Sequence, residues 1–144
     1  MKHQPGLAFS LICDQGFAVG LFTHAHGKMG ELIWIADPFF PEEPTIDDVK
    51  SIDVWRWCIF FPLSAALRKK AVSPIGSVEI PPDLAKFPTL RNGSKQQGWF
   101  VFEGGDLTHP TTKPPDPRMP IAAIVNDTRL KEMLVTGWEP SCMW

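Results

Sequence analysis

The first third of the chain, Gly6 to Asp37, constrains the fold most, because it reads as three consecutive β-strands. Leu7–Cys13 and Phe17–Phe22 are apolar, and the turn Asp14-Gln15-Gly16 separates them. A glycine close to an aspartate between two apolar runs predicts a β-hairpin, since glycine adopts the positive φ that a tight turn requires. Glu31–Asp37 is again apolar, so the three segments together predict an antiparallel meander.

A fourth strand is predicted at Val54–Phe61, where both faces are largely apolar. We expect this strand to be covered on both sides, with Trp55 on the same face as Trp57 and with Trp57 in the core. Val72–Ile80 predicts a further strand at an edge or a bulge, because Pro74 interrupts it. Gly98–Glu103 predicts another, short β-strand.

Helical signals are weaker and mostly short. Thr45 can cap one turn over residues 46–49, and residues 62–70 predict another turn. The convincing helix begins after Asn126 or Asp127, carries Leu130, Met133 and Leu134 at helical spacing, and ends at Gly137.

Two proline-containing segments predict loops. Pro81–Ser94 is loop-like, and Gly104 to Pro120 predicts an extended connection that starts with a tight turn at Gly104-Gly105-Asp106. The expected architecture is therefore α+β: a mainly antiparallel, twisted sheet or partly open barrel with one C-terminal helix packed on it. At 144 residues, the chain is most simply a single domain, 1–144.

Composition narrows the classes of function. The chain contains no apolar run of about 20 residues, so we expect no membrane span, and its first residues lack a secretory pattern, which predicts a cytoplasmic location. A formal net charge of −2, from 14 basic and 16 acidic residues, argues against nucleic-acid binding, which requires clustered Lys and Arg. Cys13, Cys58 and Cys142 are too far apart for a zinc-type pair, and we expect Cys13 and Cys58 to be buried, unreactive side chains.

His24-Ala25-His26 is the sharpest metal-like motif, because residues i and i+2 of a strand face the same way. Asp37, His3 or His109 could complete a site only if the fold brings one of them close. The pair lies where the hairpin should end, so an exposed turn is the competing interpretation. Since neither a nucleophile elbow nor a phosphate-binding loop is present in the sequence, we expect a non-enzymatic protein without metal or cofactor.

The segment from Asp37 to Asp53 is strongly acidic and has Lys50 as its single base. Such a patch accelerates association with a basic partner and orients it. Phe39 and Phe40 could add apolar anchors, or their rings could instead pack into the core behind a solubilising loop. The candidate partner-binding residues are Asp37, Phe39, Phe40, Glu42, Glu43, Asp47 and Asp48.

The order of these features resembles the immunity protein 26 family, whose members accompany toxins of bacterial polymorphic-toxin and contact-dependent competition systems. The residues that carry the resemblance are Gly6–Leu11, Asp14–Gly20, Leu32–Asp37, Ser73–Gly76 and Thr136–Pro140. The resemblance implies a cytoplasmic, β-rich protein that neutralises a cognate toxin by stoichiometric binding, without catalysis. The family defines no catalytic set, so it transfers no functional residue to this chain.

Two alternatives stay open from the residues. One is a small metal-binding barrel, possibly an enzyme, that uses His24, His26 and Asp37. The other is a barrel that binds a small molecule in a pocket lined by tryptophans, which requires an enclosed apolar cavity with few polar groups.

Overall fold

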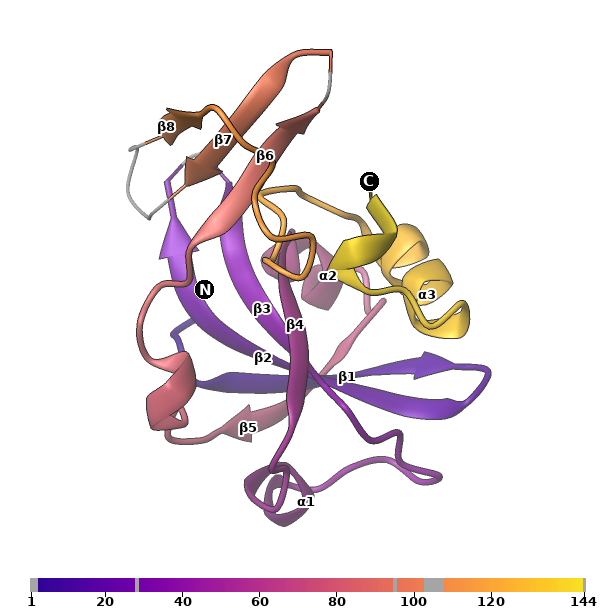
Figure 1. The fold of residues 1–144 in the computed structure, drawn as a ribbon. Helices are drawn as coiled ribbons and strands as arrows, with labels where there is room; N and C mark the ends of the chain where they lie inside the picture. The colour runs from indigo at the N-terminus through magenta and orange to yellow at the C-terminus, as the bar shows by residue number, and fades with distance from the viewer. Residues whose placement is uncertain (1–2, 28, 95, 103–107, 144) are drawn as a thin grey trace.

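The computed structural model describes residues 3–27, 29–94, 96–102 and 108–143 (Figure 1). Within these residues the chain forms a five-stranded antiparallel sheet of order β4-β3-β2-β1-β5 and a three-stranded sheet of order β6-β7-β8. The larger sheet consists of β1 (Leu7–Cys13), β2 (Gly16–His26), β3 (Gly30–Ala36), β4 (Trp55–Phe61) and β5 (Ser73–Ser77). The smaller sheet consists of β6 (Leu90–Ser94), β7 (Gly98–Phe102) and β8 (Thr108–Thr111).

The helices in the described residues are short and lie around the sheets (Figure 1). They are α1 (Ile46–Lys50), α2 (Leu63–Arg68) and α3 (Asp127–Val135), with 3₁₀ turns η1 (Pro82–Leu84) and η2 (Pro140–Met143). The predicted α+β class is confirmed. The larger sheet stays open, with β4 and β5 as its edges.

The predicted meander forms, and its first turn depends on Gly16. Asp14 and Gln15 connect β1 to β2, and Gly16 has φ = +120°. A Cβ atom at Gly16 would lie 2.5 Å from the carbonyl oxygen of Phe40, so both the conformation and the close backbone approach require glycine. Phe40 in turn pairs with Phe17 through two backbone hydrogen bonds of 2.7 and 2.9 Å.

β4 is covered on both faces, as its composition predicts. Trp57, Ile59 and Phe61 belong to the main hydrophobic cluster, which also contains the buried face of α3. Cys58 and Phe60 face a second cluster with Leu32 and Leu90.

The prediction that Trp55 shares a face with Trp57 is wrong. Ile35 pairs with Trp57 but Ala36 pairs with Trp55, so Arg56 is the extra residue of a β-bulge. A bulge changes the direction of the side chains around it. Trp55 consequently packs with Val19, Leu21 and Ala36 in a cluster on the other side of the sheet.

Several predicted boundaries are also corrected. β2 continues to His26, so His24 and His26 lie in a strand rather than in an exposed turn. The segments predicted as loops each contain a short strand, β6 in the first and β8 in the second. Both strands lack a strong apolar alternation of their own, and pairing with β7 stabilises them. The predicted turn at Gly104-Gly105-Asp106 lies outside the described residues.

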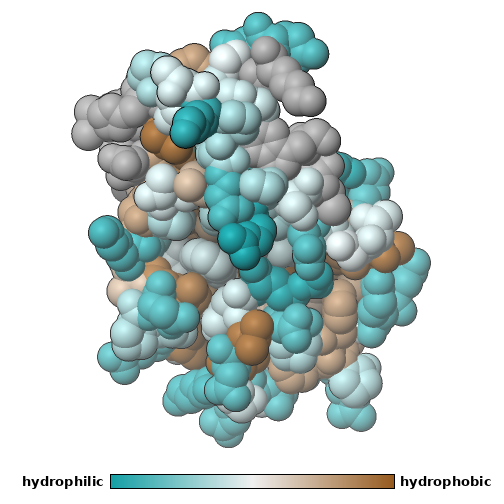
Figure 2. All heavy atoms as spheres, viewed as in Figure 1, coloured by the Kyte–Doolittle hydropathy of each residue, from teal (hydrophilic) through white to brown (hydrophobic). Residues whose placement is uncertain are grey.

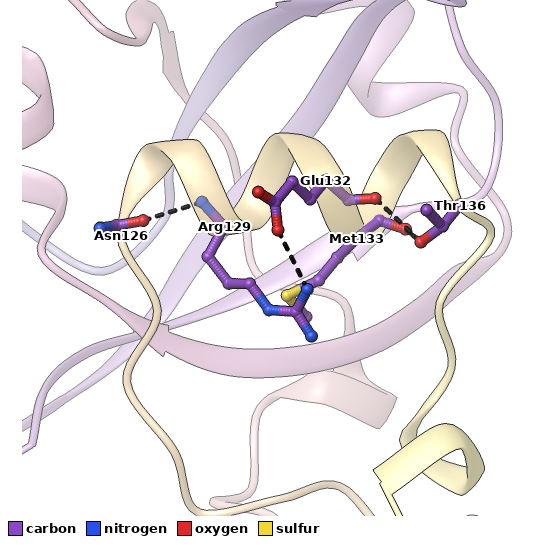
Figure 3. Close-up of polar contacts among 5 residues, drawn as sticks. All are labelled: Asn126, Arg129, Glu132, Met133 and Thr136. Atoms are coloured by element: carbon purple, nitrogen blue, oxygen red, sulfur yellow. Dashed lines mark hydrogen bonds and ion pairs between the residues drawn. The ribbon is translucent and has the colours of Figure 1, made fainter.

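α3 forms where the capping signals predict it (Figure 3). The Asn126 side chain accepts a hydrogen bond from the Arg129 N–H at 2.8 Å, and Gly137 has φ = +68° just beyond the helix. Leu130, Met133 and Leu134 are buried against the sheet. The Gln15 side chain also donates to the carbonyls of residues 134 and 135, which joins the first hairpin to the end of α3.

Hydrophilic residues cover most of the face shown in Figure 2, and apolar residues form small separate patches between them. In the described part of the chain, every helix is too short or too polar to cross a membrane.

Candidate functional site

A surface pocket of about 470 Å³ opens beside the bulge in β4, at one edge of the larger sheet. We call it the Trp–Arg pocket, because tryptophan and arginine side chains form much of its lining. Four separate segments contribute its residues: Trp34, Asp37, Arg56, Trp57, Arg118, Pro120, Glu139, Pro140 and Ser141.

The two tryptophans reach the pocket from opposite faces of the sheet. Trp57 is 2% exposed and packs edge-on against Trp138, with ring centroids 5.0 Å apart. Trp34 is half-buried and contacts the two clusters on the other face. The indole Nε1–H groups of both residues are buried without a hydrogen-bond partner in the described residues. The indole N–H groups of Trp55 and Trp138, outside the pocket, are buried without a partner in the same way, and an unpaired buried donor costs about 1–3 kcal/mol.

Arg56 faces the pocket because it is the bulged residue of β4. Its side chain is 21% exposed, and its Nε lies 3.7 Å from the Asp37 carboxylate. At this distance the two side chains form an ion pair but not a hydrogen bond. Within the described residues, the Arg56 guanidinium therefore makes no hydrogen bond to protein.

Arg91 holds the opposite wall of the pocket in place. This residue of β6 is 4% exposed, and its guanidinium donates to the carbonyls of Pro117, Met119 and Pro140. Its backbone also hydrogen-bonds Pro120 and Ala122. Burial lowers the pKa of Arg91 from its usual value, and nearby Asp116 opposes that shift. One buried side chain thus fixes both the proline-rich segment and the C-terminal turn.

The charged rim of the pocket is partly neutralised. Arg118 makes two side-chain hydrogen bonds to Asp116, at 3.2 and 2.9 Å. These bonds hold the pKa of Asp116 below its usual range and raise that of Arg118. Glu139 is exposed and has no hydrogen bond or ion pair within the described part of the chain.

The predicted partner-binding residues lie on the excursion between β3 and β4, which we call the acidic excursion (residues 37–53). Its two ends are joined by the hydrogen bond from the Asp37 N–H to the Val54 carbonyl, at 2.9 Å. Asp37, Glu42, Glu43 and Asp47 are exposed. Asp37 also lines the Trp–Arg pocket, so the acidic excursion and the pocket are continuous.

Three of the predicted residues also stabilise the fold. Phe39 and Phe40 are half-buried and pack against the two main clusters, as the core interpretation of these rings expects. The Asp48 carboxylate accepts the Thr45 N–H at 2.8 Å, while the Thr45 hydroxyl accepts the Asp48 N–H at 3.3 Å. Asp48 therefore belongs to a capping box at the start of α1.

His24 and His26 do share a face of β2, but that face is packed and hydrogen-bonded. His24 Nε2 lies 2.9 Å from the Ala85 carbonyl and its Nδ1 lies 2.9 Å from the Thr23 hydroxyl. His26 Nδ1 accepts the Met29 N–H at 3.1 Å. His24 pairs with Leu32 in β3, so Asp37 lies about 16 Å farther along that strand. The structure does not bring Asp37 to the two histidines, and the described residues contain no cluster of three metal-ligating side chains.

The cysteines differ from one another. Cys58 is 1% exposed, and burial raises the pKa of its thiol far above the usual value, as expected of an unreactive core cysteine. The predicted burial of Cys13 holds only in part, because Cys13 is half-buried at the end of β1, where it packs against the main cluster. Its pKa is also raised, mainly by partial burial.

No spacing in the sequence identifies the Trp–Arg pocket. The tripeptide Trp55-Arg56-Trp57 is a usable signal, since these residue types dominate binding sites between proteins. Arg118 and Glu139 give no such signal, because tertiary packing brings them to the pocket from distant parts of the chain.

Comparison of this chain with protein-family models, with curated proteins and with solved structures found no match.

Proposed function

We propose that this protein is a non-enzymatic immunity protein that binds a cognate bacterial toxin stoichiometrically and covers its active surface. The observation that carries the proposal is the Trp–Arg pocket and its continuity with the acidic excursion through Asp37. Tryptophan and arginine are the residues most enriched among those that dominate protein–protein binding energy. The resemblance of Gly6–Asp37 to the immunity protein 26 family supports the same function.

The two parts of this surface have complementary roles in the proposed complex. Exposed carboxylates on the acidic excursion attract a basic partner over a distance of about 8 Å at physiological salt. The pocket acts once the partner has arrived, because its tryptophan and arginine side chains exclude water and fix the position of the partner on the surface. A complex of standard size buries about 1,600 Å² in total, which a chain of 144 residues can supply.

The first experiment is a protection assay in bacteria. The protein encoded by the adjacent gene is expressed with this chain or with an empty vector, and survival is scored. We expect rescue by the chain and co-purification of the two proteins as a stoichiometric complex. If the adjacent protein is toxic and this chain neither rescues the cells nor binds it, the proposed function is wrong for that pair.

Two variants test whether the pocket mediates protection. Arg56→Ala combined with Trp34→Ala removes side chains that line the pocket, and we expect loss of rescue. Arg68→Ala, on the exposed face of α2, removes the same charge away from the pocket and should leave rescue unchanged. Thermal unfolding of both purified variants verifies that they are folded. Full rescue by the folded pocket variant would exclude the pocket from the interface.

A further inference from the structure

We propose that the Trp–Arg pocket binds a carboxylate, and that in the complex a Glu or Asp side chain of the partner supplies it. The assignment of the carboxylate to the partner rests on the proposed function. The chemical preference of the pocket rests on its own hydrogen-bonding groups.

Arg56 is the donor that lines the pocket and lacks a hydrogen-bond acceptor among the described residues. The Nε1–H groups of the lining residues Trp34 and Trp57 are buried and unpaired in the same part of the chain, as are those of Trp55 and Trp138 elsewhere, so they do not by themselves mark the pocket. The Arg56 side chain is 79% covered, and its closest charged neighbour is Asp37 at 3.7 Å, too far for a hydrogen bond. A guanidinium presents a planar pair of N–H donors that matches the two oxygens of a carboxylate, and such bidentate contacts are among the strongest hydrogen bonds in proteins.

A cationic guest fits these groups less well. It would lie next to the positive charge of Arg56, which lines the pocket. Arg118 competes only weakly with Arg56 for an anionic guest, because its guanidinium already donates two hydrogen bonds to Asp116. Two carboxylates, those of Asp37 and Glu139, already line the pocket, and both are exposed. Asp37 is the one paired with Arg56; it is 59% exposed and only loosely paired, so its carboxylate can turn toward solvent when a guest binds Arg56.

This arrangement predicts opposite effects of two neighbouring substitutions. Arg56→Met removes the cation that receives the guest and should abolish carboxylate binding. Asp37→Asn removes the competing charge and should tighten carboxylate binding by about two- to fivefold, the range of an exposed ion pair. If Arg56 and Asp37 had only a structural role, the two substitutions would not change carboxylate binding in opposite directions.

The test uses the full chain and two small probes that differ only in charge. N-acetyl-glutamate N-methylamide and N-acetyl-glutamine N-methylamide are titrated into ¹⁵N-labelled protein at pH 7, and the indole N–H resonances are followed. A Trp34→Phe variant assigns the Trp34 signal. We expect saturable, millimolar shifts of the Trp34 and Trp57 resonances with the glutamate probe and none with the glutamine probe. Arg68→Met, matched in charge to Arg56→Met, should bind like the unmodified protein.

Equal shifts with both probes, no shift with either, or unchanged binding by Arg56→Met would overturn the carboxylate site. If Arg56→Met does not fold, the exposed Asp37→Asn variant still decides the question, because weaker or unchanged binding of glutamate contradicts the proposal. The outcome is distinguishable from that of the protection assay. If the chain rescues cells but does not bind the glutamate probe, the carboxylate site is rejected and the immunity function is retained. If the chain binds the glutamate probe but does not rescue cells, the carboxylate site is retained and the immunity function is rejected.

Discussion

Neighbouring residues on and beside β4 differ widely in burial, and Trp57 is the largest of the fully buried side chains among the described residues. It is 2% exposed and stacks edge-on with Trp138, whereas Val54, just before the strand, is 56% exposed. Truncating a large buried aromatic side chain costs about 3–5 kcal/mol. We therefore expect Trp57→Ala to lower the free energy of unfolding by about that amount in urea denaturation, and Val54→Ala to change it by less than about 0.5 kcal/mol. An unchanged unfolding midpoint for Trp57→Ala would contradict its placement in the core.

Asp127 gives the fold a pH dependence. Its carboxylate lies 3.0 Å from the Lys69 ammonium, and that hydrogen bond holds the pKa of Asp127 below its usual value. A folded-state pKa below the unfolded value, about 4, means that the ionised form stabilises the fold above pH 4. This contribution is lost as the pH falls through the folded-state pKa.

We expect the thermal midpoint of the protein to fall more steeply below pH 4 than that of Asp127→Asn, which lacks the titrating group. Lys69→Met should flatten the acid dependence in the same way, because it removes the partner. Parallel pH profiles for the three proteins, measured by thermal unfolding, would show that the pair does not contribute.

At the scale of elements, α1 is a helix of five residues whose start depends on Thr45. The reciprocal hydrogen bonds with Asp48 satisfy two backbone N–H groups that a helix start leaves free. Thr45→Ala should cost about 1 kcal/mol in unfolding free energy. Glu43→Ala, on the exposed loop before the helix, is the control and should have almost no effect. Equal stability of the two variants would mean that the capping box does not stabilise α1.

The segment from Pro117 to Pro140 depends on Arg91 in a comparable way. Replacing Arg91 by methionine keeps much of the side-chain length but leaves three carbonyl groups without their donor. We expect a loss of about 2–4 kcal/mol, since each buried hydrogen bond to a charged group contributes about 1.5–3 kcal/mol and part is recovered by water. Hydrogen exchange of the backbone amides near Met119 should accelerate. If exchange and stability both stay unchanged, Arg91 does not position the wall of the Trp–Arg pocket.

At the scale of the molecule, the distribution of charge matters more than its sum. The formal net charge is −2, yet exposed carboxylates are concentrated on the acidic excursion. Reversing Glu42, Glu43 and Asp47 to lysine should slow association with the toxin by about tenfold or more at low salt. Asp48 is left intact because it caps α1.

The matched control for that triple variant reverses three exposed acids elsewhere, Asp14, Glu79 and Asp83, and so changes the net charge equally. Association rates measured by stopped-flow at several salt concentrations separate the two variants. We expect the control to keep most of the rate and most of its salt dependence. Equal rates for both variants would show that net charge, and not the acidic excursion, steers association.

Local sequence determined the elements whose signals lie within a few residues of each other. Gly16 in the first turn, the Thr45 cap and the Asn126-to-Gly137 helix signals each use backbone geometry or short-range hydrogen bonds, so they are readable without a fold. The apolar faces of β4 likewise predicted a buried strand. These features establish the α+β class.

Tertiary structure alone decided the features that depend on long-range pairing. β6 and β8 are strands because β7 supplies their hydrogen bonds, and the bulge at Arg56 arises from its register with β3. The same packing separates Asp37 from the histidines and brings Arg56 to Glu139 and Arg118 in one pocket. Composition and spacing along the chain do not predict which distant residues become neighbours. Those contacts follow from the order of strands in the sheet and from the hydrogen bonds by which buried Arg91 holds the segments of Met119 and Pro140.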